Sequence, residues 1–509
     1  MKKQIFNPYM PSYEYVPDGE PHVFGDRIYV YGSHDRFGGV HFCLNDYVCY
    51  SAPVTDLSEW RYEGVIYRKE QDPRNQNIPA DTPPNKPGYG MEMGDENSLN
   101  PPGIHAMYAP DVARGADGRY YLYYCLDCLS RIGVAVCDQP AGHYEFLGFV
   151  RHEDGTPLGD RPGDLFQFDS GIFVEEDGTV YLYSGNAPMR KEQTGEGQGS
   201  QVMTLREDML TIRTEPKRLL PGIHESQGSG FEGHEFFEAS SIRKINGRYY
   251  FVYSSVRSHE LCYAVSDRPD GGYAFGGTLV DIGNVFLGGR TEEEAENCLG
   301  NTHGGIECCD GQWYVFYHRQ TNRTQYSRQG CAEKIYLDEE GHIAQAEVTS
   351  CGLNAGPLPG TGKYPAYIAC HLTRGGKAVF SHPGAMKEEY PYLTQDCKDT
   401  EPCRELEEPV QYIHNIKDGS CIGYRYFSFQ GMGHIALSLR GKAKGKFQVM
   451  EEERGEVLGE IPVEIDSAEW RCVGGDISVR DGVHPLFFFF QGEGMVDMIS
   501  FELDERKED

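Results

Sequence analysis

The chain has 509 residues, more than one ordinary domain holds, so two or more domains are expected. Its formal net charge of −31 gives a surface that repels nucleic-acid phosphates and anionic membranes, so neither is an expected partner. The 62 glycines, 34 tyrosines and 25 phenylalanines combine turn formers with aromatic strand formers, which predicts an all-β protein.

A turn followed by an aromatic-rich strand recurs five times in the first two thirds of the chain. Asp-Gly and Asn-Gly favour the type I′ turn that joins two antiparallel strands, so each copy predicts a hairpin. Successive turns are roughly 60 to 90 residues apart, the length of a four-stranded blade with its loops. The repeat therefore predicts a five-bladed β-propeller; the alternative is two β-sandwiches with accidental similarity. The turns begin at Asp26, Asp117, Asp177, Asn246 and Asp310.

The composition changes after Leu353, which sets the expected domain boundaries. Residues 355–364 are rich in Gly and Pro and are expected to form a linker. From about residue 410 short alternating segments recur with turn signals between them, a pattern typical of a β-sandwich. We therefore expect a propeller over residues 1–354 and a β-sandwich over residues 365–509.

An ionisable side chain lies six to eight residues ahead of each predicted hairpin turn, on the strand that would line the central channel. Such side chains converge on one opening, where like charges raise one another's pKa and oppose folding. One such acid alone is typical of an exposed strand end, but five in matching positions indicate a functional site. The five residues are Glu20, Asp111, Asp169, Glu238 and His303.

Glycoside hydrolysis is the chemistry that needs paired carboxylic acids. An acid protonates the departing oxygen while a base activates water on the opposite face of the sugar. Glu238 follows Phe236 and Phe237, an apolar setting that favours the protonated form. Asp169 would supply the negative field that raises the pKa of this acid, and Glu20 would be the base.

Residues 5–350 resemble glycoside hydrolase family 43, and the order and spacing of four short motifs carry the resemblance. It implies a five-bladed propeller, an inverting mechanism, Glu238 as general acid and Asp169 as pKa modulator. The base of that family is usually an Asp directly before Pro. Here Glu20 occupies that position, and Asp18 is a second candidate if the alignment shifts by two residues. The motifs begin at Glu20-Pro21, Tyr108-Ala109, Asp169-Ser170 and Phe237-Glu238.

The resemblance also implies substrate-binding and metal residues. Arg328 is expected to bind sugar hydroxyls, and Asp111 to shape the sugar subsite. His34 and Asp35 would contribute to the subsite or cap a turn. His303 matches a central histidine that in many relatives lies near a bound calcium ion or its waters, although calcium prefers oxygen ligands. We therefore expect no required cofactor and a structural Ca²⁺ near the propeller axis at His303.

The C-terminal region resembles a carbohydrate-binding module of the family 6 type, on motifs around Gly423-Tyr424 and Gly482-Val483. Such modules stack sugars on exposed aromatic rings, for which Trp470 and Tyr426 are the candidates. The alternative is a structural domain packed on the propeller.

The expected function is an exo-acting, inverting hydrolase that releases arabinofuranose or xylose from small plant-derived oligosaccharides. The N-terminal ten residues have no apolar segment typical of a signal peptide, and the 16 cysteines lack disulfide or zinc spacing. We therefore expect a cytoplasmic enzyme with reduced thiols. The alternatives are a hydrolase of another glycoside, such as a β-galactofuranoside or galactoside, and a non-catalytic sugar-binding propeller.

Overall fold

The computed structural model describes residues 5–88, 91–127, 129–187, 199–379, 389–396 and 411–505. Strands dominate this part of the chain, and its helices are single 3₁₀ turns, none of which is long or apolar enough to cross a bilayer. The all-β prediction is confirmed. The 3₁₀ turns are η1 (Lys69–Gln71), η2 (Pro73–Asn75), η4 (Leu287–Gly289), η5 (Glu292–Glu294) and η6 (Ala366–Ile368).

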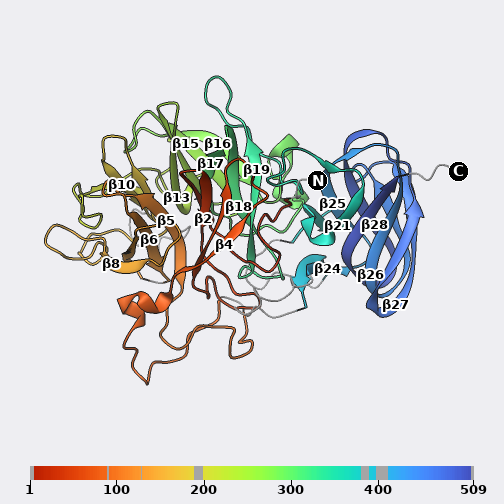
Figure 1. Ribbon diagram of the computed structural model, residues 1–509, viewed down its shortest axis with the longest axis horizontal. Coiled ribbons are helices and arrows are strands. Elements are labelled where there is room, and N and C mark those ends of the chain that lie inside the picture. The colour runs from red at the N-terminus through yellow and green to blue at the C-terminus, as the bar shows by residue number, and fades with distance from the viewer. Residues whose placement is uncertain are drawn as a thin grey trace.

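Five antiparallel sheets in chain order form the propeller (Figure 1). Four of them have four strands each, and the fifth has three within the described residues. They are β1 to β4 (Glu20–Phe24, Arg27–Tyr31, Tyr47–Pro53, Arg61–Tyr67), β5 to β8 (Met107–Arg114, Tyr120–Leu126, Ile132–Cys137, Glu145–Phe149), β9 to β12 (Gly171–Val174, Val180–Ser184, Gln201–Leu205, Lys217–Arg218), β13 to β16 (Phe236–Ile245, Arg248–Ser255, Glu260–Ser266, Ala274–Asp281) and β17 to β19 (Ile306–Cys309, Gln312–Gln320, Arg328–Ile335).

The first strand of each sheet is the innermost one. Strand β1 lies beside β5 and β17, and β9 lies beside β5 and β13, so these strands surround the axis. The five predicted hairpins join each innermost strand to the next one. At Asn246-Gly247 and Asp310-Gly311 both residues have positive φ, as the predicted type I′ turn requires. At Asp117-Gly118 and Asp177-Gly178 only the glycine does, in a longer loop.

The N-terminal segment closes the ring by binding the last sheet. The Asn7 side chain donates to the carbonyl of Ala332 at 3.1 Å and accepts from its N–H at 2.9 Å. The N–H of Tyr9 donates to the carbonyl of Gly330 at 3.3 Å. Since these are β19 residues, the start of the chain holds the first and fifth sheets together.

The C-terminal strands enclose one apolar core that includes Ile422, Phe488 and Phe501. The expected linker, residues 355–364, contributes two short strands to this sandwich, so the C-terminal unit starts earlier than the composition indicates. The strands are β20 (Leu358–Pro359), β21 (Gly362–Pro365), β22 (His371–Arg374), β23 (Tyr392–Gln395), β24 (Gln411–Ile416), β25 (Ser420–Phe429), β26 (Met432–Met450), β27 (Val457–Asp476) and β28 (Gly482–Glu505).

A buried ion pair fastens the sandwich to the propeller. Arg425 of β25 donates to both carboxylate oxygens of Glu296, each at 2.7 Å. Arg290 also donates to Glu296, at 2.6 Å. Such a bidentate pair fixes orientation as well as distance. In Figure 1 the sandwich lies beside the propeller, with β18 and β19 on the side that faces it.

Candidate active site

A cavity of about 290 Å³ opens where the five innermost strands converge. Three carboxylates from different sheets line it: Asp18 ahead of β1, Asp169 ahead of β9, and Glu238 within β13. Ten further residues complete the lining. They are Phe42, Cys43, Tyr108, Phe168, Phe237, Ser258, Asn301, His303, Gln325 and Arg328.

Uncommon backbone conformations direct all three carboxylates into the cavity. Asp18 and Asp169 have positive φ, 56° and 43°. Glu238 lies at a register shift between β13 and β14, and the next residue, Ala239, has a φ of 71°. A bulge of this kind turns a side chain away from its place in the regular strand. Residues in such conformations cluster at active sites, where the surroundings hold them.

Asp18 is an ionised carboxylate. Its Oδ1 accepts from Nη1 of Arg328 at 3.1 Å, and its backbone N–H donates to Nδ1 of His318 at 3.1 Å. Burial alone would raise the pKa of Asp18, but its neighbours, Arg328 foremost, outweigh burial, so that its pKa lies below the usual value. Because burial lowers the pKa of His318 to about 3 and that of His303 to about 4, both imidazoles are neutral near pH 7. Arg328 is therefore the charge that keeps Asp18 ionised near neutral pH.

The pKa values of Glu238 and Asp169 are raised, whereas that of Asp18 is lowered. Burial and the Asp18 carboxylate raise the pKa of Glu238, Arg328 and a hydrogen bond from Asn186 lower it, and the net value is about 7. Nδ2 of Asn186 donates that bond to Oε2 of Glu238 at 3.1 Å. Burial also raises the pKa of Asp169, with further contributions from Glu238 and Asp18. Of the three carboxyl groups that line the cavity, Asp18 thus has a lowered pKa and Glu238 and Asp169 have raised ones.

The guanidinium of Arg328 is buried and is bound by Asp35. Both oxygens of Asp35 accept from the guanidinium, at 2.8 and 2.9 Å, and Asp35 is fully buried. Asp35 therefore orients the arginine and does not line the cavity. His34 is also outside the lining: its Nδ1 bonds the carbonyl of Asp46 at 2.8 Å. Of the expected substrate-binding residues, His303 and Arg328 line the cavity and His34, Asp35 and Asp111 do not.

Glu20 and Asp111 belong to a second buried cluster along the axis. Oε1 of Glu20 accepts from Ser241 at 2.8 Å and lies 2.8 Å from Nη2 of Arg243. Asp111 contacts His22 at 2.6 Å and accepts the N–H of Ile172 at 2.7 Å. The carboxylate of Glu20 is thus engaged with Arg243, and Glu20 is not among the residues that line the cavity. The structure therefore brings Asp169 and Glu238 together with Asp18, while Glu20 lies outside.

Sequence reasoning did not assign the aromatic lining, although its signal was present. Phe168 directly precedes Asp169, and Phe237 directly precedes Glu238. Phe42 has no such signal, since it comes from the connection between β2 and β3. It packs against the guanidinium of Arg328, 4.8 Å from its ring centroid. Aromatic faces of this kind are suited to the apolar faces of sugar rings.

Comparisons with known proteins show which family the chain resembles. The sequence profile described as Glycosyl hydrolases family 43 matches residues 17–343. A xylosidase/arabinosidase from Thermoclostridium stercorarium is 49% identical over 506 residues, 99% of each chain. A xylosidase/arabinosidase from Bacteroides ovatus is 28% identical over 340 residues, 61% of this chain and 87% of that protein. A family 43 arabinoxylan arabinofuranohydrolase structure from Bacillus subtilis has a TM-score of 0.48, 20% identity, and coverage of 98% and 97%.

Proposed function

The chain belongs to the glycosyl hydrolases of family 43 and is a glycoside hydrolase; we propose that it releases xylose or arabinofuranose from short oligosaccharides with inversion. The observation that carries this proposal is the cavity in which Asp18, with a lowered pKa, and Glu238, with a pKa raised to about 7, meet. Its volume of about 290 Å³ is at the lower end of small-molecule sites, which suits one terminal sugar. The 49% identity to a protein named as a xylosidase/arabinosidase supports this choice of sugars.

Glu238 acts as the general acid in this proposal. The proton on Glu238 passes to the glycosidic oxygen as the bond to the anomeric carbon breaks. The raised pKa of about 7 keeps the proton available at neutral pH. Asp169 is the proposed modulator, because burial and the nearby Glu238 raise the pKa of Asp169, which indicates that the two carboxyls interact.

Asp18, rather than Glu20, is the proposed base. A base must be ionised and able to reach a water molecule beside the sugar. Asp18 lines the cavity and its pKa lies below the usual value. Burial raises the pKa of Glu20 despite the nearby Arg243, and its carboxylate is occupied by Arg243 and Ser241. The geometry therefore favours the second of the two sequence candidates.

A calcium ion has little support from the donors along the axis. Among the described residues, His303 belongs to no group of three or more ligand atoms close enough to share an ion. Glu20, His22 and Asp111 do form such a group, but the guanidinium of Arg243 already lies against Glu20. Calcium needs six to eight oxygen ligands, so we derive no catalytic step from a metal.

The two candidate rings of the C-terminal sandwich are both half-buried. The hydroxyl of Tyr426 donates to Glu347 at 2.7 Å, at the junction with the propeller. The guanidinium of Arg440 lies 4.5 Å from the ring centroid of Trp470. Each ring already contacts a side chain of the protein, which supports the alternative of a structural domain packed on the propeller.

We place this activity in the cytoplasm, acting on imported short oligosaccharides. Buried free thiols such as Cys43, Cys125 and Cys262 support a reducing compartment.

Hydrolysis of nitrophenyl xyloside, arabinofuranoside and galactofuranoside by the wild type and by Glu238→Gln tests the proposal. We expect the wild type to hydrolyse the first two, and the variant to lose activity by about 10² to 10⁴. Turnover of only the galactofuranoside would identify a different sugar class. No turnover on any of the three, together with measurable sugar binding, would favour a non-catalytic propeller.

A further inference from the structure

The loop of residues 321–327, which joins β18 to β19, forms one wall of the catalytic cavity. Gln325 lines the cavity. The ring of Tyr326 packs edge-on against that of Phe42, a second lining residue, with centroids 4.6 Å apart. Arg328 follows the loop directly as the first residue of β19. The position of this loop therefore sets the position of Gln325 and, through Tyr326, of Phe42.

The C-terminal sandwich holds the outer side of this loop. The N–H of Asn322 donates to the carbonyl of Leu393 at 2.7 Å. The Thr394 hydroxyl donates to Oδ1 of Asn322 at 2.9 Å, and the guanidinium of Arg323 lies 5.0 Å from the Tyr392 ring centroid. Asn322 and Arg323 both have positive φ, 52° and 51°. Since the left-handed region is unfavourable for arginine, the contacts with the sandwich add to the hydrogen bonds within the loop in holding this conformation.

A second contact joins the sandwich to β18, the strand that carries His318, which binds the backbone N–H of Asp18. The guanidinium of Arg319 on β18 donates to the carbonyls of Ala369 and Tyr367, each at 2.7 Å. Arg319 is buried and follows His318, whose Nδ1 accepts the backbone N–H of Asp18. The sandwich thus contacts both the loop and the end of the strand before it.

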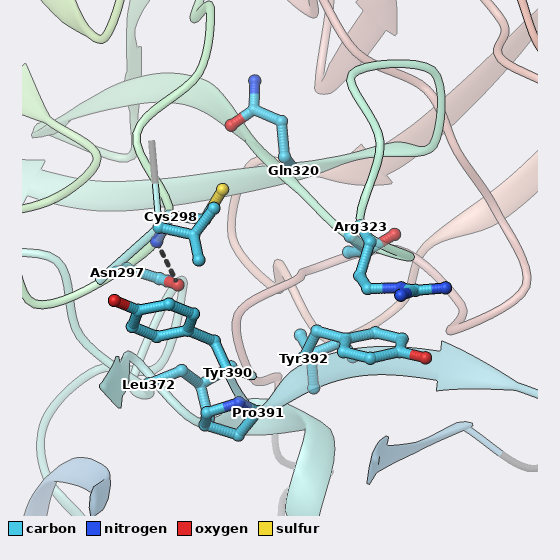
Figure 2. Close-up of a pocket in the computed structure, with 11 residues that line it drawn as sticks. Asn297, Cys298, Gln320, Arg323, Leu372, Tyr390, Pro391 and Tyr392 are labelled. Atoms are coloured by element: carbon cyan, nitrogen blue, oxygen red, sulfur yellow. Dashed lines mark hydrogen bonds between the residues drawn. The ribbon is translucent and has the colours of Figure 1, made fainter. Parts of the chain in front are cut away.

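The space between the loop and the sandwich is too small for a sugar. A cavity of about 30 Å³ lies there, enough for on the order of two water molecules. Figure 2 shows Gln320 on the far side of it from Tyr390 and Tyr392. This face is therefore a packing interface without room for a sugar ring.

We infer that the C-terminal sandwich is a positioning domain for the catalytic cavity, with Thr394 as a positioning residue that acts through Asn322 on Gln325 and Phe42. This inference rests on the proposed glycosidase function for its kinetic consequence. Arg328 itself stays bound to Asp35 at 2.8 and 2.9 Å when the loop loosens. Loss of the Thr394 contact should therefore weaken substrate binding more than the chemical step.

The test compares Thr394→Val with Thr394→Ser and a matched control in the full-length protein. Valine keeps the shape and strand preference of threonine but lacks the hydroxyl, and serine restores the hydroxyl. Thr373→Val makes the same change at another buried threonine of the sandwich, whose hydroxyl lies 3.0 Å from Nε2 of His371 and does not contact the loop. The measurements are KM and kcat on xylobiose, and amide hydrogen exchange of residues 321–327.

We expect Thr394→Val to raise KM by about two- to tenfold, the effect of one hydrogen bond, with kcat within about twofold. Exchange of the loop amides should accelerate in this variant alone. Thr394→Ser should restore both values, and Thr373→Val should leave both unchanged. Unchanged loop exchange in Thr394→Val, or equal effects of the two valine variants, would overturn the inference. If the wild type hydrolyses neither xylobiose nor nitrophenyl arabinofuranoside, the proposed function fails, and loop exchange still decides the positioning role.

Discussion

Two single substitutions distinguish the candidate bases. Asp18→Asn and Glu20→Gln each replace a buried carboxylate by its amide, so that shape is kept and charge is lost. If Asp18 is the base, Asp18→Asn should lower kcat by about 10² to 10⁴, which corresponds to about 2.7–5.5 kcal/mol of transition-state stabilisation. Glu20→Gln should leave kcat within a few-fold, because the Glu20 carboxylate faces Arg243 and not the cavity.

The two substitutions should rank the other way in their effect on stability: Glu20→Gln should destabilise the protein more than Asp18→Asn does. Asparagine accepts the positive φ of Asp18 and keeps the N–H that donates to His318, while Arg328 retains both bonds to Asp35. In Glu20→Gln the buried Arg243 loses its nearest carboxylate and keeps Glu307, at 3.3 Å. Removing one partner of a buried ion pair costs about 3–5 kcal/mol. With Glu307 present we expect the lower end, about 3 kcal/mol, and a melting temperature lower by several degrees.

The assay is turnover of nitrophenyl xyloside below both unfolding transitions, with the melting temperature of each variant measured by calorimetry. Wild-type circular dichroism spectra for both variants serve as the folding control. If Glu20→Gln lost about a hundredfold or more in kcat while Asp18→Asn stayed near the wild type, Glu20 would be the base and the reasoning from the cavity lining would be refuted.

Three further predictions follow from the same geometry. Because Glu238 is active when protonated, kcat/KM should be highest below its pKa of about 7 and fall roughly tenfold between pH 6 and pH 8; a pH–rate profile that is flat over this range would contradict its role as acid. Asn186→Ala removes a hydrogen bond that lowers this pKa, so the alkaline limb of the profile should move to higher pH; a limb that stays in place would exclude Asn186 as a contributor. Glu296→Gln leaves Arg425 and Arg290 without their shared carboxylate, so the free energy of unfolding should fall by about 3–5 kcal/mol; an unchanged calorimetric midpoint would contradict the importance of this ion pair.

The fold was predictable because one local signal repeats. Each Asp-Gly or Asn-Gly turn joins an innermost strand to its neighbour, and this spacing is enough to indicate the blades. The start of the sandwich was less predictable, because Gly- and Pro-rich residues 355–364 carry turn signals and still pair with β25 and β28. In such short edge strands, pairing with distant strands outweighs local preference.

The site was predictable where a side chain lies at a fixed distance ahead of its hairpin turn. Asp169 and Glu238 both line the cavity, as their spacing from the turns indicates, although their left-handed and bulged backbone could not be predicted from that spacing. Phe42, Asn301 and Gln325 could not be predicted, because they come from connections whose course depends on tertiary packing. The contacts of residues 321–327 with the sandwich involve segments about 70 residues apart in sequence, and no local pattern marks such a pairing.

The ambiguity between Asp18 and Glu20 has a physical origin in the strand itself. Side chains two residues apart on an extended strand point to the same face, so sequence spacing alone cannot separate Asp18 from Glu20. In the structure only Glu20 belongs to β1, and Asp18 precedes the strand in a left-handed conformation with a φ of 56°. This break in the extended backbone gives the two carboxylates different surroundings: Asp18 meets Arg328 beside the open cavity, while Glu20 meets Arg243 and Ser241. The start of the first sheet thus carries one carboxylate that lines the cavity and one that shares the neutralisation of the buried Arg243 with Glu307.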